Sequence, residues 1–180
     1  SENMRLPYAF PEDGKFNGEL RLVAARDEFE PASLVLYSFS DMKDVVLSVS
    51  DLKGADGASI PSASVDMKVV KVWFQNGNGW YSYFADAGLK LTPELLLHDE
   101  NMVKVDHALV ANHARLKDKK GARHVWVSAP FELDPESFNP VRDSFEDADT
   151  LQPVSLKAGE FKQIFLTVHV PAKQAPGVYK

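Results

Sequence analysis

The sequence predicts an all-β domain, an antiparallel β-sandwich of roughly eight to ten strands with long loops and at most one or two short helical turns. Apolar residues occupy every second position in several segments, which is the period of a half-buried strand. The 11 prolines and 10 glycines divide the chain into short elements. A parallel α/β fold needs repeated helical patterns of about 10 residues or more, and the sequence lacks them.

Residues 18–40 carry two strand patterns joined by a charged turn. Residues 18–25 and 33–40 both alternate apolar and polar positions, so each predicts a strand. The connection between them is rich in charge and ends at Pro31, which has no N–H for a ladder. We therefore expect the connection to lie at an edge or corner of a sheet.

The domain boundaries follow from composition at the two ends of the chain. Residues 1–17 mix prolines with aromatic residues and predict an extended N-terminal arm, and residues 18–180 form the β-sandwich. The end of the chain, from Pro171, contains a turn followed by three strand-like residues, which is half a hairpin. We expect this half hairpin to run back along the strand at residues 161–170, and the native chain to continue into a further domain.

Strand signals also fill the middle of the chain. Residues 44–52 alternate as a half-buried strand. Residues 65–74 change phase near Val69, which indicates either a bulge or a strand covered on both faces. The Asn-Gly repeat at residues 76–79 is typical of a hairpin turn, because both residue types tolerate positive φ.

Three later segments have different signals. Thr92, Pro93 and Glu94 are typical of a helix N-terminus and predict a single helical turn. Residues 102–129 fit either a helix ended by Gly121 or three short strands, and we favour the strands because the last part alternates. The stretch 132–149 is a long acidic loop, a length that is usually functional or mobile.

Composition limits the function classes. A chain of 180 residues is long enough for one domain with one core. The net charge of -6 equals the charge of residues 132–149, so the rest is balanced and offers no stripe for nucleic acid. The absence of cysteine excludes disulfides and thiol chemistry, and no apolar run is long enough to span a membrane. A short basic run at residues 115–123 is interpreted as a solvated turn.

The order of six segments carries a resemblance to a known family. These are AARDEFEP at 24–31, VVLSVSDL at 45–52, VKVWFQNGNGWY at 70–81, LTPELLLHDENMVKVD at 91–106, DADTLQPVSLKAG at 147–159 and FLTVHVPAKQAPGVYK at 165–180. In this order the chain resembles the N-terminal β-sandwich domain of bacterial glycoside-hydrolase-like proteins, typified by glycoside hydrolase family 123. The resemblance implies a following (β/α)₈ barrel that carries any catalytic carboxylates, so no catalytic residue is assigned to this chain.

The aromatic residues around the Asn-Gly repeat are the candidate contact site. Sugar-binding surfaces use such rings because pyranose C–H faces stack on them. The residues we assign to carbohydrate or interdomain contact are Trp73, Trp80, Tyr81 and Tyr83. Core or interdomain packing is the interpretation we favour over a sugar platform, since exposed aromatic patches mark interfaces in general.

Other chemistry has weaker signals. The acids of residues 143–149 lack the spacing of a calcium loop, and the five histidines lack metal-ligand spacing. We expect no catalytic residue, no metal and no cofactor, and the histidines are interpreted as surface or hydrogen-bonded residues.

Three functions follow in order of preference. The first is a non-catalytic accessory domain of a secreted or periplasmic carbohydrate-active protein, packed on the downstream barrel and near a poly- or oligosaccharide. The second is an autonomous carbohydrate-binding module, and the third is an enzyme with its own site among the loop acids.

Overall fold

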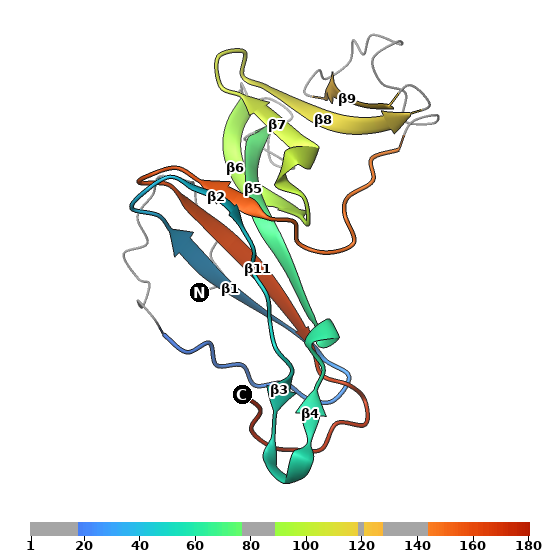
Figure 1. Cartoon of the computed structure of the whole chain (residues 1–180). Helices are drawn as coiled ribbons and strands as arrows, with labels where there is room; N and C mark the ends of the chain where they lie inside the picture. The colour runs from blue at the N-terminus through green and yellow to red at the C-terminus, as the bar shows by residue number, and fades with distance from the viewer. Residues whose placement is uncertain (1–17, 77–88, 119–120, 128–143) are drawn as a thin grey trace.

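The computed structural model describes residues 18–76, 89–118, 121–127 and 144–180 of the chain (Figure 1). These residues form eleven strands and three 3₁₀ segments. All paired strands run antiparallel, so the predicted all-β class is confirmed. None of the described segments forms a helix with the length and hydropathy needed to cross a membrane. The predicted arm of residues 1–17 lies outside the described part.

The main sheet has four strands in the order β1-β11-β5-β6. They are β1 (Phe29–Tyr37), β11 (Phe161–His169), β5 (Val65–Asn76) and β6 (Leu89–Leu97). The strand at residues 161–170 is thus confirmed, and it is central: Ile164 pairs with Leu34 on one side and Val69 on the other. The two outer strands of this sheet are β1 and β6.

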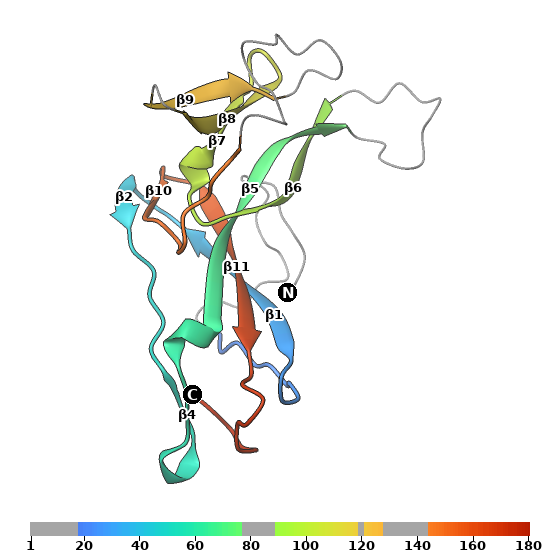
Figure 2. The same ribbon diagram turned by 90° about the vertical axis from the view of Figure 1, so that its right-hand side faces the viewer.

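The smaller sheets lie around the main sheet (Figure 2). Two of them are pairs: β2 (Met42–Val45) with β10 (Val154–Leu156), and β3 (Leu52–Lys53) with β4 (Ser59–Ile60). The other, called the β7–β9 sheet, contains β7 (Val103–Asp106), β8 (Ala111–Asp118) and β9 (Gly121–Trp126). The β3–β4 pair lies beyond one end of β5 and β11, and strands β7 to β9 lie at the other end (Figures 1 and 2). The 3₁₀ segments are η1 (Ala55–Gly57), η2 (Ser62–Ser64) and η4 (Glu100–Met102).

An apolar core joins the main sheet to the β7–β9 sheet. Its buried members come from both sheets and from η4, and we call them the apolar cluster: Val69, Leu97, Met102, Val103, Ala114 and Ile164. Ile164 is fully buried at 0% exposure. At about 25 cal/mol per Å² of apolar surface removed from water, contacts of this kind supply most of the stability of a small domain.

The predicted first strand at residues 18–25 is wrong. These residues have no ladder, and Leu20 and Val23 are 50% and 93% exposed. β1 pairs with β11, and residues 18–25 form no ladder on the other side of β1. The expectation for Pro31 is confirmed, because β1 is an edge strand in which a missing N–H costs little.

The alternation predicted for residues 44–52 is confirmed, but only the two ends of this segment belong to strands. β2 ends at Val45, and residues 46–51 are extended without a ladder. Leu47 packs against the apolar cluster while Val46 is 71% exposed. Alternation therefore reported which side chains face the core, not whether a neighbouring strand was present.

The predicted helical turn at Thr92 is wrong, because Thr92 and Pro93 belong to β6. Pro93 is tolerated there because β6 is the other edge strand. The pairing shifts between Lys71 and Val72, leaving Glu94 of β6 as an extra, exposed residue. The bulge is therefore in β6, which lies beside the strand predicted at residues 65–74. Val69 and Val70 are both buried, which confirms that the predicted strand is covered on both faces.

One further strand prediction is confirmed, and the predicted hairpin at residues 76–79 lies mostly outside the described part. Residues 103–126 form three strands, as favoured over the helix. β5 and β6 are antiparallel neighbours with Asn76 opposite Leu89, while the predicted turn falls in residues 77–88, outside the described part. The described residues contain eleven strands rather than the expected eight to ten, because the count includes β3 and β4, which have only two residues each.

The expected pairing of the chain end is wrong. Both sides of β11 are already occupied, by β1 and β5. Lys180 instead exchanges two backbone hydrogen bonds with Lys53 of β3, at 2.7 and 2.9 Å. The Tyr179 ring packs over the backbone of Gly54. A Cβ added to residue 54 would lie 2.7 Å from Cε1 of Tyr179, so the ring can lie this close only because residue 54 is glycine.

Candidate functional site

The predicted aromatic site is only partly within the described residues. Trp73 lies on β5 and packs against the apolar cluster. Its indole Nε1 is buried, and among the described residues it has no hydrogen-bond acceptor. Trp80, Tyr81 and Tyr83 lie outside the described part, so the contact role of this group stays a prediction.

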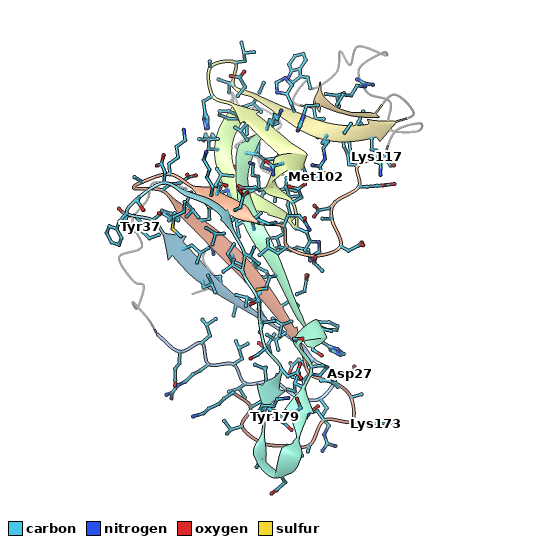
Figure 3. All side chains as sticks on the ribbon, in the orientation of Figure 1. Asp27, Tyr37, Met102, Lys117, Lys173 and Tyr179 are labelled. Atoms are coloured by element: carbon cyan, nitrogen blue, oxygen red, sulfur yellow. The ribbon has the colours of Figure 1, made fainter. Side chains whose placement is uncertain are left out.

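A group of charged side chains in the described residues gathers around the turn between β6 and β7. It contains four carboxylates, which we call the carboxylate cluster: Asp66, Asp99, Glu100 and Asp147. Met102, labelled in Figure 3, marks the place where this turn enters the junction between the two larger sheets. The sequence favours a turn here because residues 98–101 are polar and interrupt two apolar strands.

Asp147 connects the acidic segment to the turn. Its Oδ2 accepts a hydrogen bond from the backbone N–H of His98 at 2.6 Å, and its Oδ1 accepts from the backbone N–H of Asp99 at 2.9 Å. Oδ1 also accepts from the N–H of Ala148 at 2.9 Å. One side chain therefore satisfies three backbone donors of two segments, which fixes residues 147–148 against the end of β6.

His98 lies between two carboxylates. Its Nε2 is 2.7 Å from Asp66 Oδ1, and its Nδ1 is 3.7 Å from Asp147 Oδ2. Asp66 Oδ2 in turn pairs with Lys68, two residues along β5. Burial raises the pKa of Asp66, but the contacts with His98 and Lys68 outweigh burial and hold that pKa below its ordinary value.

Asp99 is the N-cap of η4. Its Oδ1 accepts from the backbone N–H of Asn101 at 2.9 Å and from the Asn101 amide at 3.1 Å. Its Oδ2 lies 2.7 Å from Arg115 of β8, so the cap also reaches the β7–β9 sheet. Burial raises the pKa of Asp99, but the Asn101 N–H and the Arg115 guanidinium together hold it below its ordinary value.

Glu100 joins the turn to β11. Its Oε2 lies 2.5 Å from Lys162 Nζ, and its Oε1 accepts from the backbone N–H of Ser155 at 3.4 Å. The side chains of Glu100 and Lys162 are only 13% and 14% exposed, so this pair is largely shielded from solvent. Lys162 is also 3.8 Å from Glu160.

Lys71 is the exception in this region. Burial lowers its pKa, and the negative charge of Glu100 opposes that shift. Among the residues described, no carboxylate oxygen lies within 4.0 Å of its amine. Lys71 thus carries the cost of desolvation without the compensation of a close ion pair.

The carboxylates of the cluster make their hydrogen bonds and ion pairs within the domain. Both oxygens of every carboxylate in the cluster have a partner within the domain, namely a backbone N–H, an amide or a cation. A general acid or base needs an oxygen directed at the substrate. The described residues also contain no group of three or more His, Cys, Asp or Glu side chains placed to hold a metal ion.

Sequence reasoning missed this cluster because its members come from distant segments. Asp66 and Asp147 are 81 positions apart along the chain (147 − 66 = 81). In the described part of the acidic stretch, residues 144–149, Asp147 is the acid that joins the cluster, and Glu146 and Asp149 are exposed. A local signal existed at residues 98–101, where a run of polar side chains separates apolar strands, but it does not identify the partners.

The histidines are placed on the surface or in contacts. His124 Nε2 is 3.0 Å from the carbonyl oxygen of Asn101. His107 packs edge-on against Phe74 at 5.7 Å, and His169 stacks on Phe29 at 4.3 Å. These positions agree with the interpretation of the histidines as surface or hydrogen-bonded residues.

No protein-family model matches the chain, and no curated protein matches it. One solved structure that resembles it is a family 123 glycoside hydrolase from Clostridium perfringens, described for glycolipid glycan hydrolysis, with 13% sequence identity and a TM-score of 0.46. The match covers 87% of this chain and 18% of that protein.

Proposed function

We propose that this chain is a non-catalytic accessory β-sandwich of a secreted or periplasmic, glycoside-hydrolase-like protein that packs on a downstream barrel. One observation supports the proposal that this chain is non-catalytic. The carboxylate cluster has both oxygens of each side chain engaged inside the domain. Such carboxylates hold segments together rather than transfer protons to a bound substrate.

The carbohydrate-related part rests on the order of the strand and turn motifs in the sequence. Those motifs span nearly the whole chain, and the all-β architecture they imply agrees with the fold. A sandwich of this kind contributes a surface to its neighbour, while the barrel contributes the reacting groups.

Exposed apolar side chains near the C-terminal end support the proposal that the chain packs on a further domain. Leu20, Leu22 and Val23 are 50%, 39% and 93% exposed, and Val178 is 75% exposed. The segment at residues 18–25 runs past the C-terminal end in both views (Figures 1 and 2). A domain attached after Lys180 would cover such a surface, which a monomeric fragment leaves in water.

The test is to express this chain and the region that follows Lys180 in the native protein as separate polypeptides. We expect them to form a complex in analytical ultracentrifugation, and Val23→Asp to weaken it, whereas Phe39→Asp, at an exposed site elsewhere, should not. A native protein without a following barrel would contradict the proposal. Hydrolysis of a glycoside by this chain alone would contradict it too.

A further inference from the structure

The β7–β9 sheet has one face in the core and one face open. Val103, Ala114 and Val125 lie opposite one another and are buried at 5%, 8% and 3% exposure. Successive side chains of a strand point to opposite faces, so the neighbouring positions form the other face. There Trp126 is 49% exposed and Lys104 is exposed.

Three side chains form a row across this open face. Lys104 of β7 pairs with His113 of β8, and His113 pairs with Trp126 of β9. Strands lie about 4.8 Å apart, so the amine-bearing and indole-bearing positions are separated by about 10 Å. That span matches one or two sugar rings, with the imidazole between the indole and the amine.

The surroundings of the row are cationic. Arg115 and His124 form the adjacent row, and Lys117 follows them on the same face. Arg115 is already paired with Asp99, and His124 contacts Asn101, so both are held in place. Besides Asp99, Asp106 is an acid at this face, and its Oδ1 accepts from the N–H groups of Ala108 and Leu109.

Lys104 and Lys117 have no such partner. Within the described segments, no acid lies within 4.0 Å of either amine. The whole chain carries a net charge of -6, so this face is a local exception on an acidic protein. An exposed indole beside unpaired amines is complementary to a ligand with an apolar face and a negative group.

We propose that the open face of the β7–β9 sheet binds an anionic saccharide. A pyranose ring stacks on Trp126, its carboxylate or sulfate is bound by Lys104, and His113 hydrogen-bonds a hydroxyl between them. This inference goes beyond the accessory role, because binding here needs no second domain. It assigns no bond-breaking step.

A saccharide fits this face better than single-stranded RNA. A base could stack on Trp126, but RNA binding draws on many phosphate contacts along a basic groove. The net charge of -6 opposes such a long polyanion, whereas a short acidic sugar meets only the local cations. Binding of RNA is therefore an outcome that the experiment must be able to reveal.

The experiment is an NMR titration of the 180-residue chain, observing the indole N–H signals of its three tryptophans. The probes are hexagalacturonate, its fully methyl-esterified form, a heparin-derived hexasaccharide and an oligouridylate. We expect the indole signal that is lost in Trp126→Phe to shift with hexagalacturonate or with the heparin fragment. The comparison of these two decides between carboxylate and sulfate.

Variants separate the stacking contact from the charge contact. Trp126→Ala should weaken binding at least about tenfold, and Trp126→Phe should retain part of it. Lys104→Gln should weaken binding of the charged sugar by about threefold to tenfold at low salt and leave the methyl ester unchanged. Phe39→Ala, at an 88% exposed aromatic residue away from this sheet, is the control and should bind normally.

The proposal is overturned by any of four results. They are no shift of the Trp126 signal at millimolar sugar, equal affinity for the methyl ester, normal binding by a folded Trp126→Ala variant, or stronger binding of the oligouridylate. Melting curves of each variant show whether it is folded. Because Trp126→Phe and Lys104→Gln change exposed side chains, they keep the test decisive if Trp126→Ala does not fold.

Discussion

The junction between the two larger sheets contains an apolar cluster and a carboxylate cluster, and the two differ in what they contribute. The apolar cluster fills its space with side chains such as Ile164 and Val69, which are almost completely buried. The carboxylate cluster keeps partial solvent contact, as the 42% exposure of the Asp66 side chain shows. Burial of apolar surface is non-directional, whereas hydrogen bonds and ion pairs act only in one geometry.

This difference assigns separate tasks to the two clusters. The apolar cluster should provide most of the free energy that holds the sheets together. The carboxylate cluster should determine where the connecting segments lie, because Asp147 and Asp99 each bind specific backbone donors. Changes in the two clusters should therefore affect stability by different amounts and with different dependence on pH.

The largest expected effect is in the apolar cluster. Ile164→Ala removes a fully buried side chain and leaves a cavity between β5, β1 and η4, so we expect a loss of about 3 to 4 kcal/mol in the free energy of unfolding. Urea denaturation measures it. Val178→Ala, at a 75% exposed site, is the control and should change the free energy by less than about 0.5 kcal/mol.

The second effect is in the shielded pair of the carboxylate cluster. Lys162→Met leaves Glu100 without its closest cation, and we expect a loss of about 2 kcal/mol. The double variant Glu100→Met with Lys162→Met should recover most of that loss, because it removes the uncompensated charge. A double variant as unstable as Lys162→Met would show that packing, and not charge, determines the effect.

The third effect is a dependence on acid. The pKa of Asp99 in the folded state lies below the ordinary 3.8, so the folded state favours the ionised form. That contribution is complete above the unfolded-state pKa and is lost as the pH falls through the folded-state pKa. We expect the free energy of unfolding to decrease below about pH 5.

Asp99→Asn should make this decrease shallower, because it removes one of the groups that bind protons on unfolding. Asp149→Asn, an exposed acid of the same acidic segment as Asp147, is the control and should leave the slope unchanged. Denaturation series from pH 7 to pH 2 provide the measurement. Identical slopes for the wild type and Asp99→Asn would contradict the role assigned to this cap.

The smallest effect has the opposite sign. Lys71→Met removes a buried amine without a close partner, and we expect it to raise the free energy of unfolding by about 1 kcal/mol. The pKa of Lys71 in the folded state is lowered, so the free energy of unfolding of the wild type increases as the pH rises from that pKa toward 10.5. The variant should lack this increase. Denaturation at pH 7 and pH 10 measures both; a less stable variant would mean that Lys71 has a favourable role.

The sequence predicted the fold class and several strands because alternation reports which side chains face a core. It predicted β11 and the strands of the β7–β9 sheet for that reason. It failed at residues 18–25 and 46–51, where alternation is present but no neighbouring strand completes a ladder. Pairing depends on the whole chain, so a local pattern cannot decide it.

The candidate sites show the same limit. Trp73 was identified from its aromatic neighbourhood, but the sequence could not place it against the apolar cluster. The carboxylate cluster joins Asp66 to Asp147 through His98, and such distant residues meet only after folding. The row of Lys104, His113 and Trp126 likewise depends on strand register, which becomes known only with the pairing.

We propose that the carboxylate cluster stabilises the fold and takes no part in hydrolysis. The most direct measurement is release of 4-nitrophenol from a panel of 4-nitrophenyl glycosides by this chain and by Asp147→Asn, with a melting curve of each. We expect no release above the protein-free rate by either, and a lower melting temperature for Asp147→Asn, because asparagine keeps only one of the two oxygen acceptors that bind the N–H groups of His98 and Asp99. Release by the wild type that Asp147→Asn abolishes at an unchanged melting temperature would contradict it.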